Sequence, residues 1–263
     1  GNNRVILATD GDLNVGLSSE SELTRLIEEK RESGVFLSVL GFGTGNYKDN
    51  RLEALADYGN GNYSYIDSEK EAKKVLVDEM SGTLFTVAKD VKFQLEFNPA
   101  NVKGYRLIGY ENRVMAAEDF NDDTKDAGEI GAGHSVTVLY EIVPADSKME
   151  LGESELKYAS DSEGVMGDEL LTVNIRYKEP EGSESKLLTY PVNKSLYSDK
   201  MSADMNFASC VAEFGMLLRN SRYIGDVTYK DVSAQLSKYD YSDDDYKDEF
   251  IYLVNTMKRR AIN

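Results

Sequence analysis

The sequence predicts a mixed fold, in which a partial parallel α/β sheet is followed by a β-sandwich-like module with C-terminal helices. Short apolar runs alternate with amphipathic helical segments in the first part of the chain, as in parallel α/β sheets. Near Ala88 the apolar residues change to a spacing of two, which is typical of antiparallel strands. Helical spacing returns near Ser202. We therefore expect two domains, residues 1–87 and 88–263, the second ending in a helical segment over about residues 202–263.

Three strands and three helices are expected in the first domain. The first strand is an unbroken apolar run, as in a strand covered on both faces: Val5, Ile6, Leu7 and Ala8. Two more strands follow over residues 35–40 and 62–66, after amphipathic helices that begin near Glu20 and Asp49. A capping box at Ser68 and Glu71 opens the third helix, whose apolar stripe is Ala72, Val75, Leu76, Met80, Leu84 and Val87. Strands separated by helices predict a parallel sheet with right-handed crossovers.

Alternating strands and turns dominate the second domain. Val91, Phe93, Leu95 and Phe97 alternate with Lys92, Gln94 and Glu96, which predicts one buried and one wet face. Further strands are expected over residues 104–110, 136–143, 155–159, 170–178 and 186–192.

The helical segment opens with a strongly apolar helix. Its inward stripe is expected to be Met205, Ala208, Val211, Ala212, Gly215 and Leu218, widened by Phe207, Phe214 and Leu217. Thr228 and Ser242 are expected to cap the N-termini of two later helices, and three basic residues end the last one, Lys258, Arg259 and Arg260.

Composition excludes several classes of function. The 263 residues contain 47 acidic and 30 basic side chains, a formal charge of −17 that disfavours nucleic-acid binding and favours metal cations or basic protein surfaces. Cys210 is the only cysteine, so there is no intrachain disulfide and no cysteine-rich zinc site. No apolar run approaches the ~20 residues of a transmembrane helix, and the N-terminus lacks the pattern of a signal peptide.

The strand end at Thr9, Asp10, Gly11 and Asp12 is the leading candidate site. Ligands bind beyond the carboxyl ends of strands in open α/β sheets, and carboxylate and hydroxyl oxygens suit a hard divalent cation. An EF-hand is disfavoured, because Val15 and Ser21 occupy the positions of its glycine and glutamate. Asp10 needs further oxygen ligands and no earlier segment supplies them, so we expect the chain to begin partway through a domain.

Other motifs favour structural roles. The glycines at 41, 43 and 45 do not fit a dinucleotide fingerprint, whose third glycine falls at Asn46. His134 is the sole histidine and is expected in a turn, because no nucleophile elbow or second metal-ligating histidine accompanies it. Cys210 is expected to be an inert core thiol, and Asp243, Asp244 and Asp245 a solvated helix start.

Together these segments resemble a bacterial von Willebrand factor A-domain protein of the YfbK-like kind, from the A domain's fourth strand onward. The residues that carry the resemblance lie over 5–12, 34–45 and 56–66 for the A domain, and over 131–136 and 211–218 for the C-terminal part. The resemblance implies a metal-ion-dependent adhesion site, to which three loops contribute, and Asp10 matches the aspartate after the fourth strand. The other two loops have no counterpart here. The parent protein is thus expected to bind Mg²⁺ or Mn²⁺, with the site incomplete in this chain.

The resemblance also implies an exported, often lipid-anchored protein of the cell envelope or extracellular space. We expect a protein–protein interaction or adhesion-like scaffolding module without enzymatic activity, catalytic residues or a resident cofactor. The alternatives are a hydrolase with its site at the sheet edge or in the β module, and a purely structural spacer. Because residues 5–8 form a flat apolar strand without a partner on one side, we also expect self-association through that edge.

Overall fold

The computed structural model describes residues 3–10, 20–43, 49–80, 82, 85–110, 114–125, 127–150 and 167–261. The chain forms two compact units. The first unit comprises residues 1–97, 115–137 and 171–191, and the second comprises residues 98–114, 138–170 and 192–263. The chain passes between the units several times, and the division at residues 87 and 88 stays a prediction.

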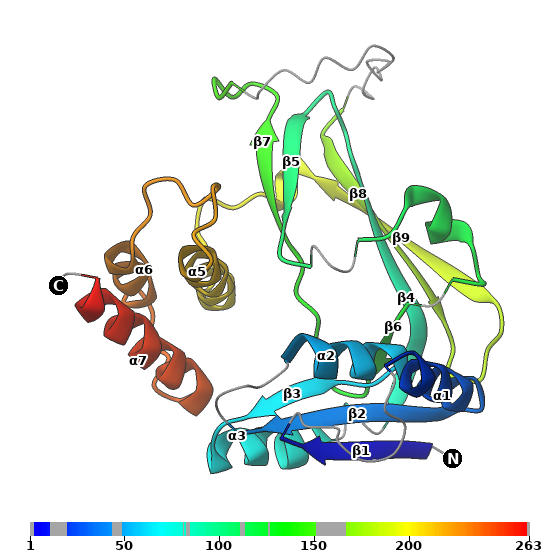
Figure 1. Cartoon of the computed structure of the whole chain (residues 1–263). Helices are drawn as coiled ribbons and strands as arrows, with labels where there is room; N and C mark the ends of the chain where they lie inside the picture. Colours follow the sequence, from blue (N-terminus) through cyan, green and yellow to red (C-terminus); the bar gives the residue numbers. More distant parts are fainter. Residues whose placement is uncertain are drawn as a thin grey trace. The chain divides into compact units, whose positions relative to one another are not determined.

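The first unit contains the expected parallel sheet. Strands β1 (Asn3–Thr9), β2 (Val35–Phe42) and β3 (Tyr63–Ile66) pair in the order β1-β2-β3. Helices α1 (Glu20–Glu32) and α2 (Asp49–Tyr58) lie on one face of this sheet (Figure 1). The core between them is apolar and closely packed: Ile27, Val39, Leu52, Leu55 and Ala56. The alternation of apolar strands and amphipathic helices therefore predicted the elements and their parallel order correctly. The expectation that Val5 to Ala8 form a strand covered on both faces is wrong within the described residues, because β1 is the edge strand of this sheet and Val5 and Ile6 are 51% and 42% exposed.

The segment after β3 differs from its prediction. Helix α3 (Glu69–Lys73) begins as expected, since the Ser68 hydroxyl accepts from the backbone N–H of Glu71 at 3.1 Å. It continues as a π-helical turn, η1 (Lys74–Asp78), and Met80 and Gly82 are again helical. Val87, expected on the helix stripe, instead lies in strand β4 (Thr86–Phe97) and is 49% exposed. Backbone pairing of β4 with β6 (Gly128–Gly131) sets this earlier strand start, because Thr86 faces Gly131 in that ladder. Leu84 lies outside the described residues.

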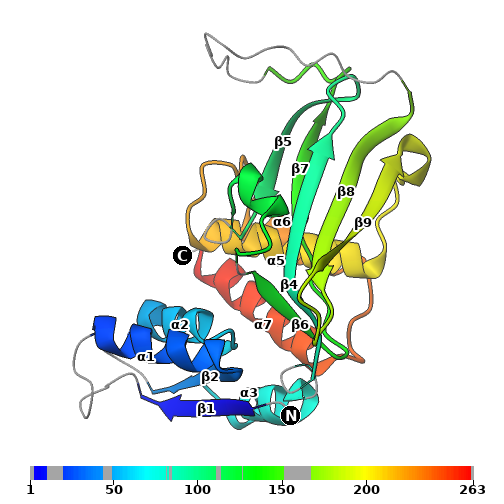
Figure 2. The same cartoon turned by 90° about the vertical axis from the view of Figure 1, so that its right-hand side faces the viewer.

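A second, antiparallel sheet completes the first unit. Its strand order is β6-β4-β8-β9, with β8 over Glu169–Lys178 and β9 over Ser185–Asn193. Figure 2 shows β4, β8 and β9 side by side as long strands. The predicted strands at residues 91–97, 170–178 and 186–192 are confirmed, whereas β6 was not predicted. The predicted strand at residues 155–159 lies outside the described residues.

The wet face predicted for β4 is wrong at Lys92. Lys92 is 3% exposed and Phe93 is 40% exposed, the reverse of the expected pattern. The reason is a covering segment: the 3-10 turn η3 (Ala117–Asn121) places its Phe120, itself 4% exposed, over this part of the unit. The alternation of apolar and polar residues along β4 cannot predict burial by a segment as distant in sequence as η3.

The second unit combines a two-stranded sheet with three helices. Strands β5 (Val102–Ile108) and β7 (Leu139–Pro144) pair antiparallel, within three residues of their predicted starts. A short 3-10 turn, η4 (Lys194–Leu196), precedes α5 (Ala203–Leu218), α6 (Tyr229–Leu236) and α7 (Asp245–Arg260). Arg106 links the sheet to the turn that follows α5, because its guanidinium pairs with Glu141 of β7 and lies 4.3 Å from the ring centroid of Tyr223 in that turn.

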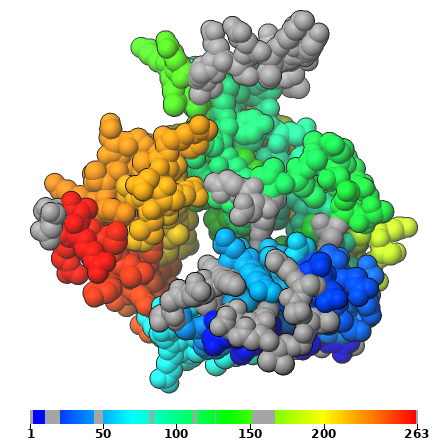
Figure 3. Space-filling view, in the orientation of Figure 1, coloured from blue at the N-terminus to red at the C-terminus, as the bar shows by residue number. Residues whose placement is uncertain are grey.

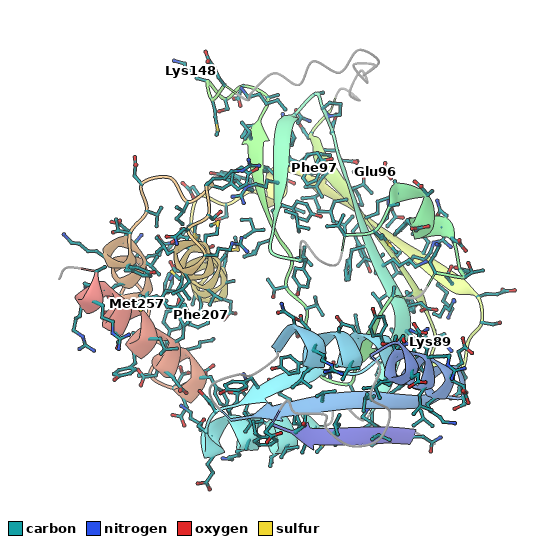
Figure 4. All side chains as sticks on the ribbon, viewed as in Figure 1. Lys89, Glu96, Phe97, Lys148, Phe207 and Met257 are labelled. Atoms are coloured by element: carbon teal, nitrogen blue, oxygen red, sulfur yellow. The ribbon has the colours of Figure 1, made fainter. Side chains whose placement is uncertain are left out.

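The three helices share one core, and Figure 3 shows their residues gathered in one body. It is built from six buried residues: Cys210, Phe214, Val232, Leu236, Tyr241 and Val254. Phe207 of α5 and Met257 of α7 pack against them (Figure 4). No helix in the described parts of the chain has the length and apolar character needed to span a membrane.

The predicted inward face of α5 is confirmed for Phe207, Phe214 and Leu217, which lie in or against the helical core, but its main stripe is wrong. Met205, Val211 and Leu218 are 45%, 43% and 52% exposed, whereas the buried face carries Asn206, Cys210 and Phe214. Both faces of α5 are apolar, so spacing alone did not decide between them. The aromatic face is the buried one, because Phe207 and Phe214 make edge-to-face contacts with Phe250 at centroid distances of 5.2 and 5.4 Å.

Helix capping follows the prediction at α6 and departs from it at α7. Thr228 and Asp231 form a reciprocal capping box at the start of α6. The N-cap of α7 is Asp244, whose carboxylate accepts from the backbone N–H groups of Tyr246 and Lys247. Ser242, expected as this cap, instead donates its hydroxyl to Asp240. The basic last turn of α7 is confirmed.

Candidate functional site

The carboxyl edge of the parallel sheet gathers its strand-end loops as expected. Asp10 follows β1 and Gly43 follows β2, and a Cβ added at Gly43 would lie 4.0 Å from the Cβ of Asp10. Gly43 has φ +98°, a left-handed conformation that favours glycine. The hydroxyl of Tyr65, in β3, donates to the carbonyl oxygen of Gly43. All three strands thus contribute to one edge around Asp10.

Asp10 is exposed at this edge and supplies one carboxylate. Gly11 and Asp12 lie outside the described residues. Among residues that the structure does describe, no group of three or more His, Cys, Asp or Glu side chains is placed to hold a metal ion. Asp10 fits a hard cation by chemistry, since carboxylate oxygens suit Mg²⁺ and Mn²⁺. Its role as a metal ligand stays a prediction.

The structure also places three other residues that the sequence singled out: His134, Cys210 and Asp244. His134 is exposed in the loop that follows β6. Cys210 is fully buried, and burial raises the pKa of its thiol to about 11, which keeps it protonated and unreactive at neutral pH. Within the acidic run at 243–245, Asp244 caps α7 as described above. The expected core and helix-start roles of Cys210 and Asp244 are confirmed.

A cluster of buried cations on β4 and β8 was missed by sequence reasoning. The Lys92 ammonium donates to the carbonyl oxygens of Asp119 and Asp122 at 3.0 and 2.5 Å. Lys178, 9% exposed, donates to a carboxylate oxygen of Asp90 at 2.6 Å and to the carbonyl oxygen of Asp123 at 2.8 Å. These contacts fasten η3 and the acidic turn that follows it onto the sheet.

Arg176 completes this cluster on the same strand face. Its guanidinium donates to Ser185 at 2.6 Å and to Asn121 at 2.9 Å, and lies 5.7 Å from the ring centroid of Phe120. Hydrogen bonds from Thr124 lower the pKa of the Asp122 carboxyl group, which favours its charged form. The sequence signal was a row of cations on two alternating strands together with an acid-rich turn. This arrangement holds the loop on the sheet.

Strand β9 exposes several apolar side chains of the first unit. It is the last strand in the order β6-β4-β8-β9, so within the described residues its outer edge has no neighbouring strand. Leu187, Leu188 and Tyr190 are 50%, 39% and 53% exposed, and successive residues of a strand point to opposite faces. Both faces of β9 therefore present apolar surface. The hydroxyl of Thr189 donates to Asn174 of β8 at 2.9 Å and fixes the position of the strand.

Comparison with known proteins identifies a family. The family model described as "Uncharacterized protein YfbK, C-terminal" matches residues 82–259. The chain is 44% identical over 259 residues to the uncharacterized protein YfbK of Escherichia coli (strain K12), a match that covers 97% of this chain and 44% of that protein. This chain thus spans less than half of that relative's length.

Solved structures give only distant likenesses. A von Willebrand factor type A protein from Catenulispora acidiphila is 13% identical with a TM-score of 0.37, over 89% of this chain and 53% of that chain. The human COPII-coat protein Sec24c is 11% identical with a TM-score of 0.37, over 89% of this chain and 32% of that chain. Likenesses this distant carry no functional argument.

Proposed function

This chain belongs to the YfbK C-terminal family, and we propose that it acts as a protein–protein interaction or adhesion-like scaffolding module. The observation that supports this proposal best is strand β9, an edge strand with exposed apolar side chains on both faces. An extended segment of a partner adds a strand to such an edge, where backbone hydrogen bonds give affinity and alternate side chains give specificity. The partner we propose is a protein segment in extended conformation.

The composition of β9 supports recognition rather than uncontrolled aggregation. Lys186 stands at its beginning and Pro191 near its end, and both residue types limit edge-to-edge pairing of identical sheets. Between them, Leu187 to Tyr190 leaves room for a short partner strand. The formal charge of −17 favours a partner whose surface is basic.

We propose a role without enzymatic activity. The two alternatives, a hydrolase and a structural spacer, require different structural features. A hydrolase needs an activated nucleophile or a carboxylate pair in a cleft, and the thiol of Cys210 is buried and protonated. A structural spacer needs no exposed apolar strand. The formal charge of −17 disfavours nucleic acid as a partner, because an acidic surface repels phosphate groups.

The proposals on metal and location rest on the family resemblance. We propose that Asp10 contributes to a Mg²⁺ or Mn²⁺ site only together with other oxygen ligands, since such cations take six or more. A place in the cell envelope or outside the cell is proposed on the same ground. The edge of β1, where Val5 is 51% and Ile6 is 42% exposed, remains a predicted surface for self-association.

Site-specific photo-crosslinking in the source cell tests the interaction function. A photoreactive amino acid at Leu188 is expected to capture one dominant protein, whose crosslinked peptide is then located by mass spectrometry. The matched control is Val77, which is apolar and 64% exposed but lies in η1. Capture at Leu188 that Tyr190→Lys abolishes supports the proposal. Equal capture at Leu188 and Val77, or capture that Tyr190→Lys leaves unchanged, contradicts it.

A further inference from the structure

Helix α5 carries a second apolar face that its own unit does not use. Met205, Val211 and Leu218 are 45%, 43% and 52% exposed on it, and Ala208 and Ala212 lie between them. A Cβ added at Gly215 meets no atom within 4 Å, so the surface above this residue is open. The opposite face, with Cys210 and Phe214, is the one that packs on α6 and α7. This exposed stripe plays no part in the function proposed for β9.

The stripe is symmetric about its own midpoint, between Val211 and Ala212. Met205 lies as far before this midpoint as Leu218 lies after it, and Ala208 and Gly215 are related in the same way. Its residues recur three or four positions apart, as they do along the seam of two packed helices. In an antiparallel pair related by a two-fold axis, Met205 of one copy therefore meets Leu218 of the other, Ala208 meets Gly215, and Val211 meets Ala212 at the centre.

Charge repeats the same symmetry. Asp204 and Arg219 are equidistant from the midpoint, and the Asp204 side chain is 90% exposed. A two-fold axis through the midpoint places Asp204 of each copy beside the partner's Arg219, twice in the dimer. A parallel pair would instead place equal charges together. Lys247 also faces Asp204, at 3.4 Å, but it lies over the rings of Phe207 and Tyr241 as well.

We propose that the exposed face of α5 binds the same face of a second copy of this chain, with the two helices antiparallel about a two-fold axis. Val211 and Ala212 lie on either side of the axis, and beyond them Ala208 of one copy meets Gly215 of the other, where small residues allow the helices to approach within about 8–10 Å. The surface of one helix face is smaller than the ~800 Å² per partner of a standard interface. The dimer is therefore weak, with a dissociation constant of about 10 μM or above.

Sedimentation equilibrium of charge-reversed variants tests the pairing. Asp204→Arg and Arg219→Asp each replace two attractive contacts by two repulsive ones, and each alone is expected to weaken dimerisation about tenfold. An equimolar mixture of the two variants restores both attractive contacts and is expected to form mixed dimers at the strength of the unmodified chain. A mixture no stronger than its components overturns the antiparallel arrangement, as does a chain that stays monomeric at 1 mM.

A second variant separates lost pairing from lost folding. Gly215→Trp places a large ring where a Cβ meets nothing in the chain, so thermal unfolding is expected to stay within a few degrees while dimerisation is lost. Leu188→Lys on β9 is expected to leave dimerisation unchanged, which keeps this test independent of the proposed function. Dimers that survive Gly215→Trp but are lost in Val5→Lys belong to the β1 edge and overturn the proposal.

Discussion

Replacing Lys92 by Met tests whether buried cations hold the acidic turn on the antiparallel sheet. Met keeps most of the apolar stem of Lys92, which is 3% exposed, and removes only the ammonium group. That group donates to the carbonyl oxygens of Asp119 and Asp122 at 3.0 and 2.5 Å. The substitution therefore leaves the volume of the site nearly unchanged and removes two charge-assisted hydrogen bonds.

The expected loss of stability follows from two opposing effects. A hydrogen bond to a charged group contributes about 1.5–3 kcal/mol, so the two bonds contribute about 3–6 kcal/mol together. Removing the Lys92 ammonium group from water on folding offsets part of this stabilisation, and the Met variant has no such desolvation penalty. Because Asp119 and Asp122 are only half-buried, water also replaces some of the lost contacts. We expect a net destabilisation of about 2 kcal/mol.

Thermal unfolding and hydrogen exchange measure this effect. A loss of about 2 kcal/mol lowers the melting temperature by about 4–8 °C, and faster exchange is expected at the backbone amides of residues 117–125. Lys186→Met is the matched control, because Lys186 is 57% exposed, and it is expected to change stability by less than about 0.5 kcal/mol. A Lys92→Met variant as stable as Lys186→Met, or with faster exchange only in α5 to α7, would refute the reasoning.

Three further predictions concern single groups. Thr228→Ala removes the capping box of α6 and is expected to cost about 1 kcal/mol at pH 7, measured by thermal unfolding. Hydrogen bonds from Thr228 lower the pKa of Asp231, so the capping stabilisation is present above the unfolded pKa of about 3.9 and is lost as the pH falls through the folded pKa. A stability difference between the unmodified chain and Thr228→Ala that grows in acid would contradict this. Cys210 is expected not to react with a thiol reagent at pH 8 until the chain unfolds, since burial raises its pKa to about 11, and rapid native reaction would count against its core position. Calorimetric titration with Mg²⁺ or Mn²⁺ is expected to show no micromolar binding, because the metal site is expected to be incomplete in this chain. Micromolar binding that is lost in Asp10→Ala would contradict this expectation.

The sequence predicted those parts of the fold whose signal is local. The parallel strands, α1, α2 and the capped start of α6 follow from apolar runs, periodicity and side-chain caps within a few residues. The burial of Lys92 depends on η3, which begins 25 residues further along the chain, at Ala117. No local pattern contains that information.

Of the candidate surfaces, one could be predicted from local sequence and two depend on packing between distant segments. Asp10 was placed correctly at the carboxyl edge because strand ends of a parallel sheet meet there. Both faces of α5 were predicted to be inward because both are apolar, and only the face with Phe214 packs against the aromatic partners that α6 and α7 supply. The exposure of β9 depends on its place at the edge of the sheet, which strand alternation alone does not specify.

Hydrogen exchange of β9 tests the central claim, that this strand is where a partner binds. In the free chain, the backbone amides on the outer edge of residues 185–193 face no strand within the described residues and are expected to exchange rapidly. When the partner captured through Leu188 is bound, alternate amides of β9 are expected to become protected, because an added strand accepts from every second N–H group. Bound partner with exchange in β9 unchanged would contradict the account.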